Sequence, residues 1–240
     1  MAYSFDHTRG DNRLLAAMPT DAISLLNSDL RQVSVEQGAV ILEAGAPIEN
    51  VYFPQTGIIS LLIVSKDGRA IEATTVGREG AVGLHGALGS RRSFTRATAQ
   101  IGGKCSTIRA ARLRRIVSGN VLVRDLVTRY LEVLWAEAQQ IGACNAAHDA
   151  SARLCRWLLQ TADRTSSESI PLTQEFLAQM LSVRRTTVTL LAKSLQAKGV
   201  ISYRRGQIMI LDRKALEACA CECYRVIHHD HLPRALGLIL

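Results

Sequence analysis

Residues that could contact a polyanion gather between Thr173 and Leu211, in the last third of the 240-residue chain. From Leu172 to Gly206, six lysines and arginines stand against a single acid, Glu175. These basic residues are Arg184, Arg185, Lys193, Lys198, Arg204 and Arg205. A guanidinium group can donate two parallel hydrogen bonds to guanine, and threonine offers a hydroxyl and a methyl group to other base edges. The residue types therefore suit contact with double-stranded DNA.

Helical spacing predicts the elements that would present these side chains. Thr173 is a favourable N-cap residue, and Glu175 places a negative charge in the first turn, where the helix dipole favours it. Apolar residues then recur at helical spacing until a break at Ser182. A second helix is expected to follow, to run to about Lys198 and to end at Gly199, which favours a left-handed stop. Its apolar face consists of Val188, Leu191, Ala192 and Leu195.

A β-hairpin is predicted after the second helix. Its strands are expected at Val200–Tyr203 and Gln207–Leu211, joined by the turn Arg204-Arg205-Gly206, which would hold two guanidinium groups at the tip. Helices, turn and basic hairpin fall where a winged helix-turn-helix needs them; the alternative is a helical hairpin with a solvated basic face. The pattern assigns base reading to Arg185, Thr186 and Thr189. It assigns phosphate contact to Thr173, Arg184, Lys193, Arg204 and Arg205.

Composition limits the class of protein. The net charge of +8 and the pI near 9.5 favour a polyanionic partner, although charge alone does not separate DNA from RNA or a membrane surface. The longest apolar run, Gly57–Val64, is too short to span a bilayer. Residues 1–7 lack a signal-peptide pattern, so we expect a cytoplasmic protein without a membrane partner, whose six cysteines are reduced.

The N-terminal half reads as a β-rich domain. Two short helices are expected at Asn12–Met18 and Thr20–Ser28, followed by short β-rich runs separated by glycines, which is typical of a sandwich or barrel. The expected strands are Leu30–Val35, Val40–Leu42, Asn50–Phe53, Ile58–Val64, Ala70–Val76, Ser93–Ile101 and Lys104–Ile108.

Helices connect the β-rich domain to the predicted DNA-reading unit. A short helix is expected at Ala110–Ser118, a long one from Val121 to about Ala143, and a third at His148–Arg164. The long helix carries a seam at roughly 3–4 spacing, made of Val123, Val127, Tyr130, Leu134 and Ile141. Such a seam favours pairing with a second copy of the chain. The alternative is burial against the β-rich domain.

Together these elements resemble the Crp/Fnr family of bacterial transcription regulators, over about Thr20 to Leu216. The resemblance is carried in the N-terminal half by Gln37-Gly38, Glu43-Ala44-Gly45, Asn50–Phe53 and Gly57. In the C-terminal half it is carried by Leu172-Thr173, Arg185–Val188, Leu195, Gly199–Ile201 and the wing. It implies an α+β chain: a jelly-roll or β-roll sensor domain, a long dimerisation helix and a C-terminal winged helix-turn-helix.

The family resemblance also implies domain bounds and partners. We expect an N-terminal segment at 1–19, the sensor at 20–120, the dimerisation helix at 121–145, the DNA-binding domain at 146–225 and a tail at 226–240. Each recognition helix of a homodimer would lie on one half of a pseudo-palindromic operator, and RNA polymerase would be a partner.

Departures from the family pattern bear on the effector. Members that bind cyclic AMP carry a Gly-Glu pair that grips the ribose, but here Gly83 precedes Leu84. Arg92 and Ser93 could still cradle a phosphate; alternatively the basic residues of this stretch form a solvated loop. The possible effector pocket is therefore Gly83, Leu84, Arg92 and Ser93, and a cyclic nucleotide is not expected as cofactor. The oxygen-sensing branch holds an iron–sulfur cluster with N-terminal cysteines. Because the first cysteine here is Cys105, that mechanism is not expected.

The recognition helix departs as well. The family's usual Arg-Glu pair is Arg185-Thr186 here, so the carboxylate that would accept a hydrogen bond from the cytosine amino group is absent. The operator sequence therefore cannot be inferred from that of relatives. Arg184 replaces the usual capping residue, a role left to Ser182.

A cysteine–histidine tail is not explained by the family pattern. Cys219, Cys221 and Cys223 are followed by three histidines. On one continuous helix Cys219 and Cys223 would share a face and Cys221 would point away. The candidate ligands for zinc or copper are then Cys219, Cys223 and His228, which would make the protein a thiol- or metal-responsive regulator. The alternative is a helix with buried thiols and a polar tail.

Catalysis is not expected. The sequence offers no serine–histidine or paired-carboxylate arrangement of recognisable spacing and no glycine-rich loop that opens a helix. His148 beside Asp149 is interpreted as part of a helix cap. A third possible function is a signalling module whose β-roll binds a ligand or partner while the basic wing reads no sequence.

Overall fold

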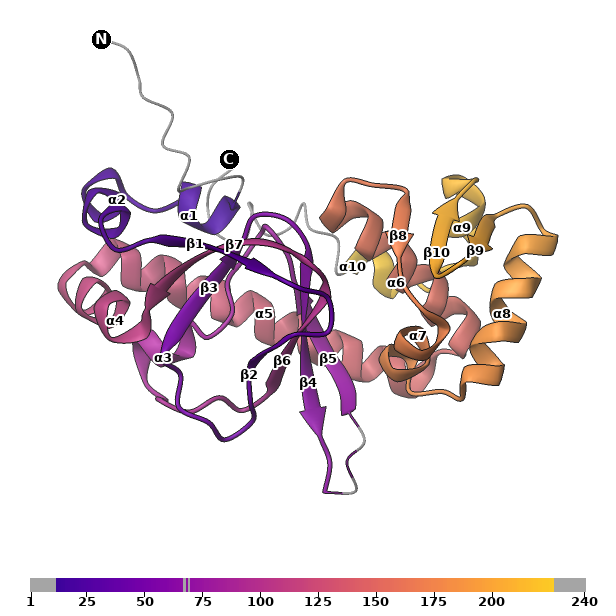
Figure 1. Ribbon diagram of the computed structural model, residues 1–240, viewed down its shortest axis with the longest axis horizontal. Helices are drawn as coiled ribbons and strands as arrows, with labels where there is room; N and C mark the ends of the chain where they lie inside the picture. The colour runs from indigo at the N-terminus through magenta and orange to yellow at the C-terminus, as the bar shows by residue number, and fades with distance from the viewer. Residues whose placement is uncertain (1–11, 67, 69, 227–240) are drawn as a thin grey trace, which may run out of the picture. The chain divides into compact units, whose positions relative to one another are not determined.

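The structure, a computed structural model, describes residues 12–66, 68 and 70–226 (Figure 1). These residues form two compact units. The first contains 12–61 and 75–135, and the second contains the described residues of 62–74 and 136–226. Helix α5 (Val121–Ala147) contributes residues to both.

The first unit contains helices and strands of two sheets. One sheet has the order β1-β7-β3 and the other β2-β6-β4-β5. The strands of these sheets are β1 (Arg31–Val35), β2 (Val40–Leu42), β3 (Asn50–Pro54), β4 (Ile58–Val64), β5 (Ala70–Val76), β6 (Arg96–Ile101) and β7 (Gly103–Arg109). The end of β4 and most of β5 fall within 62–74 and so belong to the second unit. The helices are α1 (Arg13–Ala16), α2 (Thr20–Asn27), α3 (His85–Leu88), α4 (Ala110–Gly119) and the first part of α5. The predicted β-rich domain is confirmed.

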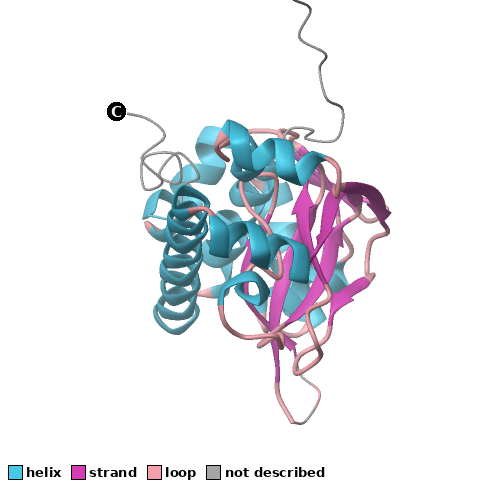
Figure 2. Ribbon diagram, turned by 90° about the vertical axis from the view of Figure 1, so that its left-hand side faces the viewer, coloured by secondary structure: helices cyan, strands magenta, loops and turns pink. Residues whose placement is uncertain are grey.

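A core of the first unit lies between its helices and the β1-β7-β3 sheet. Figure 2, coloured by secondary structure, shows the strands side by side. Central members of this core are Phe53 on β3, Ile108 on β7, Leu113 on α4 and Tyr130 on α5, all buried. Along β3, Val51 and Phe53 are buried and Tyr52 between them is half-buried, because successive side chains of a strand point to opposite faces. The core fixes α5 against the sheet.

The predicted dimer seam of α5 is wrong for its buried members, which include Ile141 in a core of the second unit. Val123, Val127 and Tyr130 are buried in the core of their own unit, and the Tyr130 hydroxyl oxygen accepts a hydrogen bond of 3.1 Å from the Ala81 amide. A different stripe at 3–4 spacing is exposed. It consists of Val121, Asp125, Thr128, Glu132 and Trp135. Spacing alone predicted a seam but not which of two phase-shifted stripes faces the sheet.

The second unit is a helical domain with a three-stranded antiparallel sheet of order β8-β10-β9. Its strands are β8 (Ser169–Pro171), β9 (Ile201–Arg204) and β10 (Gln207–Ile210). Its helices, besides the end of α5, are α6 (Ala150–Thr165), α7 (Gln174–Leu181), α8 (Arg185–Ala197), α9 (Arg213–Cys219) and α10 (Cys223–Val226). The short elements α3, β8 and α10 were not predicted. No helix in the described part of the chain is long and apolar enough to cross a membrane.

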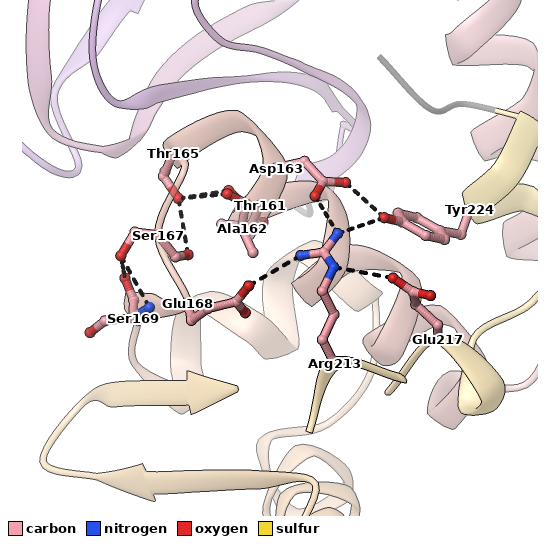
Figure 3. A network of polar contacts seen from close by, with 10 residues as sticks. All are labelled: Thr161, Ala162, Asp163, Thr165, Ser167, Glu168, Ser169, Arg213, Glu217 and Tyr224. Atoms are coloured by element: carbon pink, nitrogen blue, oxygen red, sulfur yellow. Dashed lines mark hydrogen bonds and ion pairs between the residues drawn. The ribbon is translucent and has the colours of Figure 1, made fainter. Parts of the chain in front are cut away.

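A polar network around Arg213 holds α6, α9 and α10 together (Figure 3). The guanidinium of Arg213 donates to Asp163 on α6, to Glu168 and to Glu217 on α9. It also donates to the hydroxyl of Tyr224 on α10, which in turn donates to Asp163 at 2.9 Å. Burial raises the pKa of Tyr224, as does the hydrogen bond to Asp163, so its hydroxyl stays protonated. The network positions α10 together with the apolar contacts of Cys223, which is buried in a cluster with Ile141.

Candidate nucleic-acid interface

Helices α7 and α8 form the predicted helix-turn-helix. The Thr173 hydroxyl oxygen caps α7 by accepting a hydrogen bond from the Phe176 amide at 3.2 Å, as expected. Ser182 is in the left-handed conformation, and the Val183 amide donates to the Ala178 carbonyl, which is the pattern of a Schellman stop. Ser182 therefore ends α7 and does not cap α8. The N-cap of α8 is Arg184, which makes no side-chain cap hydrogen bond.

The outer face of α8 carries the predicted reading residues. Arg185 and Thr186 are exposed in its first turn, and Lys193 is exposed two turns later, while Val188, Ala192 and Leu195 are buried. An arginine in the first turn of such a helix can reach base edges in a major groove. The structure thus leaves Arg185 and Lys193 both exposed on α8.

Thr189 is less free than the sequence indicated. Its hydroxyl donates to the Gln174 side-chain oxygen at 2.9 Å and lies 3.1 Å from the Arg185 carbonyl. The side chain is half-buried and links α8 to α7. Its methyl group and its hydroxyl oxygen lone pairs remain available for a base edge.

Sequence reasoning missed Leu190, which is 68% exposed beside Thr189 and Lys193 on the outer face of α8. A leucine in a helix is usually predicted to be buried. Because Leu190 lies two residues from both Val188 and Ala192, which are buried, helical spacing places it on the opposite, outer face. An exposed apolar side chain on such a face suits the methyl group of thymine.

The wing is a tighter hairpin than predicted. Arg204 and Gln207 pair directly, so the turn consists of Arg205 and Gly206 alone, with φ of 50° and 76°. Positive φ at both central residues is the mark of the hairpin turns whose twist matches the strands. Arg204 and Arg205 are exposed at the tip, and the Gln196 side chain at the end of α8 accepts from the Tyr203 amide at 2.7 Å. The wing is therefore fixed to α8.

Two family models match the chain in sequence order. A cyclic nucleotide-binding domain matches residues 32–120, and a Crp-like helix-turn-helix domain matches residues 152–219. Together they match about two thirds of the chain. A search of curated proteins returned no match.

Solved structures of regulators share the fold. FixK2 from Bradyrhizobium japonicum matches with a TM-score of 0.70 and 18% identity, over 80% of this chain and 98% of FixK2. The c-di-GMP-responsive global regulator CLP from Xanthomonas campestris matches with 0.65 and 16%, over 81% and 100%. TTHA1359, a CRP/FNR-family transcriptional regulator from Thermus thermophilus, matches with 0.61 and 23%, over 79% and 98%. The chain belongs to the Crp/Fnr family.

In this Crp/Fnr chain, the predicted effector residues do not all line one cavity. Gly83, Leu84 and Ser93 border a cavity of about 20 Å³ in the first unit, which has room for about one water molecule. Arg92 is not part of the lining; its guanidinium donates to the Gly45 carbonyl at 2.6 Å. The Ser93 hydroxyl donates to the Thr95 carbonyl at 2.7 Å. These polar groups are engaged within the protein.

His85 is a further residue of this cavity that sequence reasoning did not single out. Its ring stacks on Phe94, with centroids 5.5 Å apart. Burial lowers the pKa of His85, so the ring is neutral at neutral pH. Its Nε2 atom is buried and has no hydrogen-bond partner among the described residues.

The segment with Cys219, Cys221 and Cys223 is not the continuous helix that was predicted for this Crp/Fnr chain. Helix α9 ends at Cys219, Ala220 is extended, and α10 begins at Cys223, so no single helix joins Cys219 to Cys223. Cys221 is buried beside Cys223, whereas Cys219 is only half-buried. The predicted ligand set is therefore wrong for Cys219, and His228 lies outside the described residues. Asp149 is the N-cap of α6 and accepts from the Ala152 amide at 2.9 Å, which leaves His148 without a capping role.

Proposed function

We propose that this Crp/Fnr protein regulates transcription as a homodimer that binds a pseudo-palindromic operator. The observation that carries the proposal is the exposed face of α8 with Arg185 and Thr186 at its start, next to the wing with Arg204 and Arg205. Arg185, Thr186 and Thr189 read bases, and Leu190 adds an apolar contact. Thr173, Arg184, Lys193, Arg204 and Arg205 contact phosphates, which supply most of the affinity and none of the sequence information.

The first unit modulates DNA affinity through α5 in this proposal, and RNA polymerase is the protein partner in the cytoplasm. A cyclic nucleotide is not proposed as effector, because the small cavity bordered by Leu84 leaves no room for one without rearrangement. CLP is a global regulator and TTHA1359 is a transcriptional regulator, and no enzymatic activity is proposed.

Selection from a random pool of double-stranded DNA tests the function. The full chain is expected to enrich a motif with twofold symmetry whose half-sites are about one helical turn, or 10–10.5 base pairs, apart. The matched control is the same selection with Arg185→Ala, which should enrich a motif with at least one position per half-site relaxed. Enrichment of no motif, with binding that depends only on salt, would instead favour a signalling module with a non-specific basic wing.

Dimerisation is expected through the exposed stripe of α5 defined above. Trp135 is 66% exposed on this stripe, and a large aromatic side chain left open on a long helix suits the centre of a symmetric interface. In a twofold dimer the same residue of both chains lies in the interface. A single substitution that introduces a charge therefore places two like charges in that interface.

Trp135→Glu is therefore expected to convert the dimer into a monomer that unfolds at nearly the same temperature as the wild type. Sedimentation velocity at micromolar concentration measures the change. Leu25→Glu, at an exposed leucine of α2, is the matched control and should remain dimeric. A Trp135→Glu protein that stays dimeric would place the interface elsewhere.

A further inference from the structure

Four metal-ligand side chains from two distant segments meet in the second unit. Cys144 lies near the end of α5, and His148 is the residue after it. Cys221 lies in the loop before α10, and Cys223 is the first residue of α10. One ligand atom from each lies within 4.8 Å of all the others. The three cysteines are buried. Neither the helix-turn-helix nor the proposed interface with DNA uses any of them.

Two of the distances between ligand atoms are close to those of a tetrahedral zinc site. With zinc–sulfur bonds of about 2.3 Å and zinc–nitrogen bonds of about 2.0 Å, ligand atoms of a tetrahedron lie about 3.3–3.8 Å apart. The Cys144 and Cys221 sulfurs are 3.5 Å apart, and the Cys223 sulfur lies 3.7 Å from Nδ1 of His148. Cys144 and His148 are four residues apart, so the helix puts both on one side. Three thiolates and one imidazole are a ligand set of structural zinc sites.

Side chains around the four residues make the hydrogen bonds that are typical of the groups surrounding metal ligands. Nε2 of His148 lies 3.1 Å from a carboxylate oxygen of Glu222, so the ring can donate there and direct the Nδ1 lone pair toward Cys223. A carboxylate on the far nitrogen of a ligating histidine is the usual outer partner of zinc. The Gln140 side-chain amide donates to the Cys223 sulfur at 3.1 Å, as outer partners of metal ligands do.

A buried cation supplies independent support. Arg156 on α6 is only 3% exposed, and no carboxylate among the described residues pairs with it. It donates to the Gln160 side chain at 2.6 Å, while its Nε atom has no partner. A buried cation without an anion is costly, whereas zinc with three thiolates and a neutral histidine carries a net charge of −1. Because α6, which carries Arg156, packs against α10, a loaded site would place negative charge in the same part of the unit.

We propose that Cys144, His148, Cys221 and Cys223 bind one zinc ion. Because protein atoms fill all four positions, the site is structural rather than catalytic. It joins residues 77 apart in the chain and encloses α6 to α9, the whole DNA-reading domain, within one loop. Closing a long loop stabilises the folded state most. The ion thus ties the end of α5 to the end of the winged helix, independently of what binds the β-roll.

Metal content of the full-length wild type is the primary test. Protein purified without chelator is expected to contain one zinc per chain by elemental analysis and native mass spectrometry. After zinc removal, cobalt(II) should restore a visible spectrum with intense thiolate charge-transfer bands of a tetrahedral site. A wild type that binds neither ion would overturn the proposal. So would a metal-free chain two mass units light from a Cys144–Cys221 disulfide, or a chain that holds iron and sulfide instead.

Single substitutions then test the ligand set. Cys144→Ser, Cys223→Ser and His148→Gln should each weaken zinc affinity by at least about 10-fold, and Glu222→Gln, at a positioning residue, by about 10–100-fold. Cys219→Ser is the matched control in the same tail, and Cys155→Ser is a control for a buried thiol of α6; both should keep one zinc per chain. Loss of zinc in Cys219→Ser equal to that in Cys223→Ser would contradict this set. Because a ligand variant can fail to fold, the wild-type cobalt spectrum decides the outcome alone.

Discussion

Arg185→Ala is expected to weaken binding to the selected operator by about 1–3 kcal/mol per half-site, while binding to random DNA changes little. The reason is that Arg185 is exposed in the first turn of α8, where its guanidinium can donate two hydrogen bonds to guanine. Loss of this side chain lowers the affinity and also removes the discrimination between bases at the base pair that it contacts. Competition binding against operators substituted at each position measures both, and discrimination should disappear at one position per half-site.

A phosphate-contact variant provides the contrast. Arg205 has a left-handed backbone next to Gly206, so Arg205→Asn removes the charge and leaves an Asn-Gly turn, which favours this conformation. Affinity should fall alike for all sequences, and the slope of log affinity against log salt should become shallower by about 0.9 per lost contact.

Arg185→Lys separates charge from geometry at the base-reading position. Lysine keeps the charge but loses the planar fork, so specificity should fall while the salt slope stays nearly unchanged. If Arg185→Ala and Arg205→Asn had the same effect across all sequences and salt concentrations, the division between base reading and phosphate contact would be wrong.

Gly80→Ala is expected to lower the free energy of unfolding by about 3 kcal/mol or more, with a fall in Tm of about 6–12 °C. A Cβ atom at this buried position would overlap the ring and hydroxyl of Tyr130 on α5. Tyr130 would have to move, which breaks its hydrogen bonds with the amide and carbonyl of Ala81 and leaves these groups buried without partners. Calorimetry of the full chain measures the change.

The matched control is Gly119→Ala, because a Cβ atom at the end of α4 meets nothing within 4 Å. It should change stability by less than about 1 kcal/mol. Combining Gly80→Ala with Tyr130→Phe removes the overlapping hydroxyl, so the double variant should lose less than the sum of the single losses. Additive losses would show that Gly80 acts through another contact.

The DNA-reading unit could be predicted closely because its signals are local. The Thr173 cap and the apolar face of α8 each depend on residues within a few positions along the chain. The same locality explains its errors. Ser182 is a plausible cap for either helix by type, and only its left-handed backbone shows that it ends α7.

The orientation of α5 could not be predicted in this way. Two stripes at 3–4 spacing run along it, and both contain apolar side chains, Tyr130 on one and Trp135 on the other. Which stripe is buried depends on the fit of Tyr130 beside Gly80, a residue 50 positions away that spacing along the helix does not reveal.

The sequence by itself determined the winged helix-turn-helix, the β-rich domain and the positions of the cations that would contact DNA, because caps, periodicity and charge act between near neighbours. Only the tertiary structure decided how α5 is rotated, how little space remains beside Leu84, and which cysteines meet. Cys144 and His148 approach Cys221 and Cys223 because α6 to α9 fold back between them. Such contacts depend on long-range packing and are not encoded in local spacing.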